Sequence, residues 1–200
     1  MDAWLANICQ MKNVEIVEDY DQSEDPAAQA DELTEGGWCL GVVIDWLRCK
    51  RNSMDFWDSF RSGSGKNRVR FIMARQAIIK AKGSGSDVAG KMKEGMKAAG
   101  MSERSSNARL NIGQVSAADL YHALAATQGR YITVVIGGAG GSHALGILIS
   151  QTQLVFLDPN AGEFAFPTKA TFREWLPIFL TGMGYSGQGL LSSFQMDSFG

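Results

Sequence analysis

Apolar residues recur with helical spacing through the first 130 residues of the chain. Between residues 38 and 50 they stand at i, i+3, i+4 and i+7, which places them on one face of a helix. These positions are Leu40, Val43, Ile44 and Leu47. Further helices are predicted over residues 67–82, 87–99 and 116–127. The first part of the chain is therefore predicted to be mainly helical.

The pattern changes after Arg130, where β-branched and aromatic runs are interrupted by glycine and proline. The runs YITVVI, HALGILIS, QLVFLDP and EFAFP predict an antiparallel sheet, because such short runs bounded by turn residues are typical of strands. The segment TKATFREWLPIFL predicts a last amphipathic helix, and LLSSFQM predicts a final strand. Helices first and strands second are typical of an α+β fold with two lobes.

The first residues of the chain differ from the rest in composition. Residues 15–35 have little periodicity, so residues 1–35 are interpreted as an acidic N-terminal arm that is mobile or wraps the surface. Residues 36–200 are predicted to form a single domain. Its helical lobe is expected over residues 36–129 and its sheet lobe over residues 130–200.

Charge is unevenly distributed along the chain. Residues 15–35 contain nine acidic residues and no Lys or Arg, whereas residues 48–109 are mostly basic. We expect these regions to pair within the fold, with an acidic partner for the basic region as the alternative. The formal net charge of the whole chain is only -2 and the pI is about 5.7, so its charge does not predict a nucleic-acid partner.

Several classes of protein and site are disfavoured by composition. No run of eighteen apolar residues predicts a membrane span, and the N-terminus lacks the basic and apolar regions of a Sec-type signal peptide. Two histidines and three scattered cysteines have no paired metal-ligand spacing, so no metal and no other cofactor is expected. The three thiols are predicted to be free, and the chain is expected to be made in a cytoplasm.

Two glycine-rich motifs are poor candidates for phosphate binding. GGAGGSH, at residues 137–143, leads into a predicted strand, whereas a phosphate loop leads into a helix whose amides bind the anion. SGSGKN, at residues 62–67, lacks the upstream glycine and the following Ser or Thr of a P-loop, so it is interpreted as a linker.

Nucleophilic catalysis by a cysteine needs a thiolate, an imidazole and a group that orients the imidazole. Cys39 is the best candidate nucleophile, because the first turn of a helix favours a thiolate and Gly36 and Gly37 allow a substrate backbone to approach. Cys9 is expected near an unstructured end. Cys49 has basic neighbours, but it is predicted in the last turn of its helix, where the dipole opposes a thiolate.

The candidate imidazole is His143, because it opens a predicted strand that forms a hairpin with the next one. A tight turn near residues 150–153 would place the far ends of these strands side by side, so His143 and Asp158 are predicted to be neighbours. The alternative is a histidine that only opens a strand and an aspartate that only caps the DPN turn. His122 is interpreted as an ordinary, partly buried helical residue.

Three stretches together resemble the YopT/AvrPphB family of cysteine proteases, peptidase family C58. They are GGWCLGVVIDWL around Cys39, SHALGI around His143 and VFLDPNAGEF around Asp158. The resemblance implies a papain-like fold, in which a helix carrying the cysteine packs on an antiparallel sheet carrying the histidine and the aspartate. Between residues 50 and 130 the resemblance is architectural only.

The resemblance also implies a role for each residue. Cys39 would be the nucleophile, His143 the general acid and base, and Asp158 the group that fixes the His143 tautomer. The Cys39 backbone amide would bind the oxyanion, with Thr34 as the second donor, because DELTEGGW has no Asn or Gln close to the cysteine. The expected substrate contacts are Trp38, Gly37 and Ser142. Phe164 and Phe166 are expected in the core in preference to the cleft.

The predicted function is that of a bacterial effector: a cysteine endopeptidase that cleaves a specific target protein. The chain would be delivered into a target cell by a specialised secretion system, with a secretion chaperone or an immunity protein as a further partner. One alternative keeps the triad but uses it as a deamidase, a transglutaminase-like enzyme or a cell-wall peptide amidase. A second alternative is a catalytically dead papain-like binding module.

Overall fold

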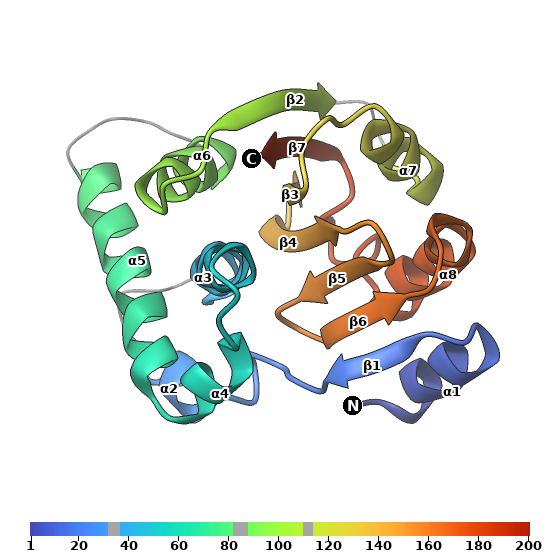
Figure 1. The fold of residues 1–200 in the computed structure, drawn as a ribbon, viewed down its shortest axis with the longest axis horizontal. Coiled ribbons are helices and arrows are strands. Elements are labelled where there is room, and N and C mark those ends of the chain that lie inside the picture. The colour runs from blue at the N-terminus through green and yellow to red at the C-terminus, as the bar shows by residue number, and fades with distance from the viewer. Residues whose placement is uncertain (32–36, 82–87, 110–113) are drawn as a thin grey trace.

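A computed structural model of the chain describes residues 1–31, 37–81, 88–109 and 114–200, with residues 78–81 described by their backbone alone. Within this part of the chain, seven strands form one antiparallel sheet in the order β1-β6-β5-β4-β3-β7-β2. Figure 1 shows the sheet edge-on, with helices on both of its faces. The strands are β1 (Glu15–Glu18), β2 (Glu103–Arg109), β3 (Tyr131–Gly138), β4 (Gly141–Ile149), β5 (Leu154–Asp158), β6 (Gly162–Phe166) and β7 (Ser193–Phe199).

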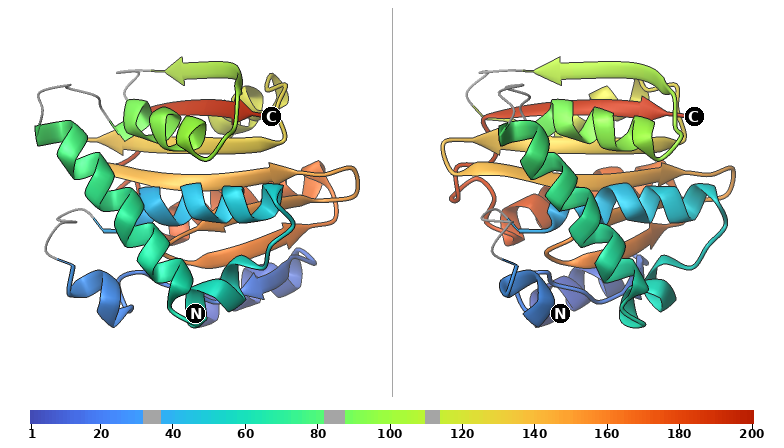
Figure 2. Two further views of the ribbon diagram at one scale, coloured as in Figure 1. Left: turned by 60° about the vertical axis from the view of Figure 1, so that its left-hand side comes forward. Right: turned by 90° about the vertical axis from the view of Figure 1, so that its left-hand side faces the viewer.

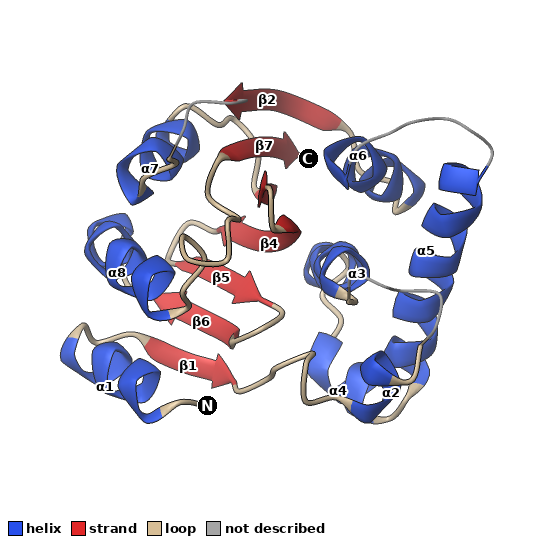
Figure 3. Cartoon of the chain, turned by 180° about the vertical axis from the view of Figure 1, so that it is seen from behind, coloured by secondary structure: helices blue, strands red, loops and turns tan. Residues whose placement is uncertain are grey.

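The helices form two layers around the sheet, which are also visible from behind in Figure 3. One layer consists of α1 (Ala3–Met11), α7 (Ala117–Ala125) and α8 (Lys169–Gly182). The other consists of α2 (Pro26–Gln29), α3 (Cys39–Arg51), α4 (Phe56–Arg61), α5 (Ser64–Ala81) and α6 (Val88–Ala98).

Each face of the sheet has its own hydrophobic core. In β5, Leu154 and Phe156 join the core beneath α1, α7 and α8, whereas Val155 and Leu157 join the core beneath α3. This division follows from the alternation of side chains along a strand. A sheet covered on both faces explains why the central strands are apolar at nearly every position.

Helix α3 is the most enclosed helix of the fold, because it lies between the sheet and the outer helices. Figure 2 shows α3 along the strands with α5 crossing outside it, and every residue from Cys39 to Leu47 is buried. Gly146 of β4 allows this close packing, since a Cβ atom there would lie 2.9 Å from the Trp46 ring. The buried Glu163 carboxylate accepts hydrogen bonds from the indoles of Trp46 and Trp57 and from Lys50.

The structure confirms the predicted α+β architecture and its main elements. The four helices predicted before residue 130 appear as α3, α5, α6 and α7, and the last helix and final strand appear as α8 and β7. The predicted linker at residues 62–67 is wrong in part, because α5 begins at Ser64. Gly63, with φ +86°, turns the chain just before this helix.

The sequence reading missed two edge strands and three helices. Strands β1 and β2 are polar and largely exposed, so they lack the apolar alternation that predicts a strand, and backbone pairing with β6 and β7 defines them. The predicted helical lobe therefore includes β2. The division into an arm of residues 1–35 and a domain of residues 36–200 stays a prediction, but β1 belongs to the same sheet as the rest.

The acidic region pairs with basic residues of the same chain, as predicted. Glu18 pairs with Arg61, Asp25 lies 2.8 Å from the Lys66 ammonium, and Asp31 lies 3.6 Å from Arg70. These contacts fasten residues 18–31 along α4 and α5. Part of the opposite charge of the two regions is therefore compensated within the fold.

Candidate active site

The cysteine of the predicted triad lies at the start of α3, with Trp38 as the preceding cap residue. Gly37 has φ +82°, a conformation that favours glycine, and it turns the chain into the helix. The Cys39 side chain is nearly buried, at 5% exposure. The first turn of the helix thus holds the thiol in a fixed position, in the partial positive field of the helix N-terminus.

His143 lies on β4, which packs against α3, and its ring interacts with the Cys39 sulfur. Burial opposes the Cys39 thiolate, but the hydrogen bond and charge of His143 and the backbone amides of Ala144 and Leu40 outweigh it. The net effect is a lowered pKa of the Cys39 thiol. A thiolate and an imidazolium are therefore favoured as a pair.

Asp158 lies at the end of β5, next to the first residues of β4. The His143 Nε2 atom is 2.8 Å from Asp158 Oδ1, which leaves the other ring nitrogen for the Cys39 sulfur. Burial disfavours the charged imidazole, but the Asp158 carboxylate and Cys39 more than compensate and raise the pKa of His143 to about 10. The structure thus brings Cys39, His143 and Asp158 together, with His143 interacting with both of the others.

Two further groups hold the Asp158 carboxylate in place. The Tyr185 hydroxyl donates to Oδ2 at 2.6 Å, and the Asn160 backbone amide donates to Oδ1 at 2.8 Å. Tyr185 is completely buried and its ring centre lies 5.3 Å from that of His143. Burial and the neighbouring Asp158 carboxylate both raise the pKa of Tyr185, so its hydroxyl stays a hydrogen-bond donor.

Gln22 connects the cysteine loop with the turn that follows Asp158. Its side-chain oxygen accepts the Trp38 backbone N–H at 2.7 Å, and its Nε2 donates to Asn160 Oδ1 at 2.6 Å. Its own backbone N–H donates to the Pro159 carbonyl. A Cβ atom on Gly37 would lie 3.2 Å from Gln22 Oε1, so the glycine also allows the amide to approach.

Sequence reasoning missed both Gln22 and Tyr185. Gln22 lies in the acidic region, which was interpreted as an arm, and Tyr185 lies in a glycine-rich segment after α8. No local motif marks either residue. The sequence offers only the residue types as a signal, because an amide or hydroxyl side chain can donate a hydrogen bond in an active site of this kind.

The remaining predicted site residues have different environments. Thr34 lies outside the described residues. Trp38 is fully buried, its indole donates to Asp31, and its backbone N–H donates to Gln22, so its side chain is not placed to contact a substrate. Phe164 and Phe166 lie in the core, as expected. Gly37 is partly exposed and Ser142 is exposed.

The other thiols and the second histidine lie outside this arrangement. The expectation that Cys9 is near an unstructured end is wrong, because Cys9 is buried in α1, where burial raises the pKa of its thiol. Burial and the nearby Asp45 carboxylate raise the pKa of Cys49 despite its arginine neighbours. His122 is exposed on α7, not partly buried as predicted.

Two kinds of feature are absent from the described residues. No group of three or more His, Cys, Asp or Glu side chains there has a geometry that could hold a metal ion. None of the described helices combines the length and apolar character that crossing a membrane requires.

Comparison with known proteins identifies relatives over nearly the whole chain. The profile of the family Peptidase_C58, described as Yersinia/Haemophilus virulence surface antigen, matches residues 8–199. The crystal structure of the Pseudomonas avirulence protein AvrPphB is similar, with a TM-score of 0.65 and 16% identity, and the match covers 85% of this chain and 95% of that chain. This likeness supports a papain-like cysteine protease fold.

Two further proteins are similar to this chain. The protein adenylyltransferase and cysteine protease IbpA of Histophilus somni is 40% identical over 50 residues, which are 24% of this chain and 1% of that protein. The chain thus spans a very small part of this curated relative. The YopT domain of the Pasteurella multocida PfhB2 toxin is 20% identical, with a TM-score of 0.34 and 94% of each chain covered.

Proposed function

Because the chain belongs to peptidase family C58, we propose that it is a cysteine endopeptidase in which Cys39, His143 and Asp158 form the catalytic triad. The observation that supports this proposal most is the coupled arrangement of the three buried side chains. The pKa of Cys39 is lowered and that of His143 is raised to about 10, which favours a nucleophilic thiolate paired with an imidazolium.

The proposed reaction begins with attack of the Cys39 thiolate on a peptide carbonyl carbon, and the carbonyl electron pair moves to oxygen. The oxyanion collapses, the C–N bond breaks, and His143 gives its proton to the leaving amine. Water then attacks the thioester while His143 takes its proton. Release of the carboxylic acid restores the thiolate and the imidazolium. Asp158 keeps the His143 ring oriented throughout, as in other triads.

The backbone amide of Cys39 is the first proposed oxyanion donor, because it lies at the N-terminus of α3. Gln22 is our candidate for the second donor. Its Nε2 atom donates one hydrogen to Asn160 Oδ1, and its Oε1 atom accepts the Trp38 backbone N–H. The second Nε2 hydrogen has no partner among the described residues, and it is the hydrogen that we propose for the oxyanion. Thr34 stays an alternative that rests on the sequence alone.

We also propose that the natural substrate is a protein of a target cell and that the chain reaches this cell through a specialised secretion system. The family description as a virulence surface antigen supports a role of this kind. Fusion to a reporter that is modified only inside target cells would test delivery. Signal from bacteria that lack any such secretion system would contradict it.

The first experiment is alkylation of each cysteine by dilute iodoacetamide across pH 4 to 9, measured by peptide mass spectrometry. An ordinary thiol reacts with a midpoint near about 8.5, whereas a paired thiolate still reacts several units lower. Cys39 should react at pH 6 and lose this reactivity in His143→Ala. Cys9 and Cys49 are buried and the pKa values of their thiols are raised, so both should stay unreactive at pH 6. A Cys39 that is equally unreactive at pH 6 would refute the triad.

The second experiment distinguishes proteolysis from other acyl chemistry. A library of unstructured peptides is incubated with the protein and with Cys39→Ser, and products are identified by mass spectrometry. New peptide termini that require Cys39 would support an endopeptidase. A gain of about 1 Da at glutamine without cleavage would instead indicate a deamidase, and binding without turnover in either protein would indicate a dead module.

A further inference from the structure

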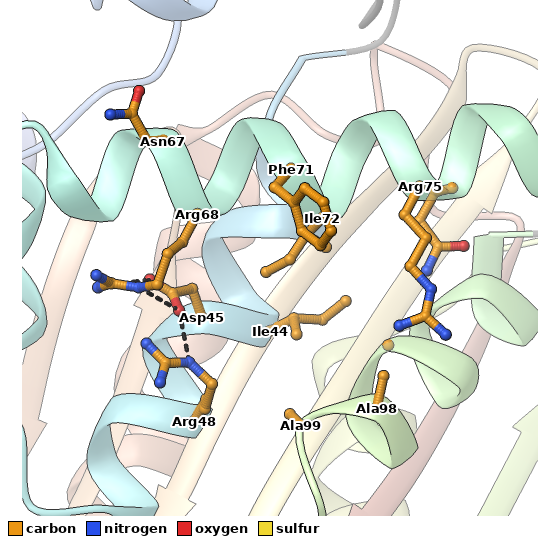
Figure 4. Close-up of a pocket in the computed structure, with 12 residues that line it drawn as sticks. Ile44, Asp45, Arg48, Asn67, Arg68, Phe71, Ile72, Arg75, Ala98 and Ala99 are labelled. Atoms are coloured by element: carbon orange, nitrogen blue, oxygen red, sulfur yellow. Dashed lines mark hydrogen bonds and ion pairs between the residues drawn. The ribbon is translucent and has the colours of Figure 1, made fainter.

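A second concave site lies on the outer side of α3, between α3, α5 and α6. It has a volume of about 430 Å³. Figure 4 shows Ile44, Phe71 and Ile72 at this site, with Ala98 at the end of α6 and Ala99 just after it. The volume lies within the range of sites that bind small molecules, roughly 300–1,000 Å³.

The site is separate from the triad. Ile44 follows Cys39 by five residues, which is about 7.5 Å along a helix, and it lies on the side of α3 that packs against α5 and α6. None of the three proposed catalytic residues lines the site. Occupation of this site therefore does not require an active Cys39.

The polar groups that line the site are mostly positive. Arg48 and Arg68 both pair with the buried Asp45, so their charges are partly compensated. Arg75, by contrast, is exposed and has no acidic partner within the part of the chain that the structure describes. The three arginines and Asp45 leave the lining with a positive excess.

Gln76 provides an independent sign of a missing partner. This residue lines the site and is only 4% exposed, yet its Oε1 atom has no hydrogen-bond partner within the described residues. A buried acceptor without a donor is costly, by about 1–3 kcal/mol. An N–H group of a bound molecule would satisfy it. The Phe71 side chain is 71% exposed at the same site, so a bound molecule could also cover its apolar surface.

We propose that this site binds a short peptide segment of a partner protein in which acidic and bulky apolar residues alternate. A carboxylate would pair with Arg75, a backbone N–H would donate to Gln76, and an apolar side chain would fill the space beside Phe71 and Ile72. A lipid acyl chain has no donor for Gln76. A basic segment would be repelled by the excess positive charge of the site. A purely acidic segment would leave the apolar side chains of the site exposed to water.

Direct binding tests this assignment without any need for turnover. Fluorescein-labelled peptides are titrated with the full chain carrying Cys39→Ser, and anisotropy is measured. The first peptide alternates Asp with Leu and Phe, the second has Lys in place of Asp, and the third has Ser in place of Leu and Phe. Only the first should bind with saturation.

Two substitutions at exposed positions of the site should weaken binding. Arg75→Glu removes the proposed carboxylate partner and should weaken binding about tenfold or more, the effect of a lost charge-assisted hydrogen bond. Ala98→Trp should block the space. Arg104→Glu makes the same charge change on β2, away from the site, and should leave binding unchanged. Circular dichroism of each variant confirms folding.

Several outcomes would overturn the proposal. One is equal binding of the acidic and basic peptides, and another is saturable binding that survives Ala98→Trp. No saturation by the first peptide at millimolar concentration is a third. Sedimentation that reveals a dimer abolished by Ala98→Trp would assign the site to a second copy of the chain. Binding to phosphatidylserine vesicles lost in the same variant would assign it to a membrane surface.

Discussion

Replacing Tyr185 by Phe removes one hydroxyl from the environment of the proposed triad and leaves the ring in place. The hydroxyl donates to Asp158 Oδ2 at 2.6 Å in a completely buried position. Oδ1 keeps its contacts with His143 and with the Asn160 amide. In Tyr185→Phe, Oδ2 is therefore left without a donor among the described residues.

The size of the effect follows from the type of bond. A hydrogen bond to a charged group contributes about 1.5–3 kcal/mol, so the free energy of unfolding should fall by about that amount. In Tyr185→Phe the negative charge of the Asp158 carboxylate is also less compensated. This charge favours the imidazolium of His143 and opposes the thiolate of Cys39. We therefore expect the pKa values of both His143 and Cys39 to rise, by about one unit if about 1.4 kcal/mol is transferred to this equilibrium.

The assay is the pH profile of Cys39 alkylation, followed by peptide mass spectrometry. In Tyr185→Phe its acid midpoint should move to higher pH, whereas a purely structural role for Tyr185 would lower stability and leave the midpoint unchanged. Tyr121→Phe removes a hydroxyl from α7 and serves as the matched control. An unchanged midpoint in Tyr185→Phe, with a folded protein, would refute the argument that Tyr185 supports the charge of Asp158.

Three further predictions follow from contacts around the site. Gln22→Ala disconnects Trp38 from Asn160 and removes the proposed second oxyanion donor, so it should lower any turnover by about 10²–10³-fold. Gln29→Ala makes the same change at an exposed position and should leave turnover unchanged. Equal rates for the two variants would exclude a role for Gln22. Glu163→Ala should lower the free energy of unfolding, measured in urea, by about 3–5 kcal/mol, because Lys50 and two indoles lose their buried carboxylate partner. Glu174→Ala, which removes an exposed ion pair, should change it by less than about 1 kcal/mol. Similar values for the two variants would contradict the burial argument. The third concerns pH. Stabilisation from the raised pKa of His143 is complete below pH 6.5 and is lost as pH rises to about 10, whereas stabilisation from the lowered pKa of Cys39 is gained as pH rises towards 9.0. The two contributions oppose each other below pH 9.0, so stability there should fall less steeply with pH than His143 alone would make it fall. Cys39→Ser should lose stability more steeply as pH rises through this range, and identical urea profiles would count against the ion pair.

Local patterns were sufficient for the elements that carry the proposed triad. The apolar spacing after Trp38 predicts α3, and the runs before and after the turn at residues 150–153 predict β4 and β5. The hairpin geometry alone places His143 beside Asp158, because antiparallel strands joined by a tight turn align their far ends. These relations depend on residues close together in the chain, so the sequence by itself determines them.

Tertiary structure alone decided which residues support this site. Gln22 lies 16 residues before Trp38 and 138 before Asn160, and Tyr185 follows Asp158 by 27 residues. The edge strands β1 and β2 likewise depend on pairing with distant partners, and their polar sequences carry no alternation of their own. Contacts of this kind arise only when the chain packs, because burial and hydrogen bonding between distant segments have no signature in local spacing.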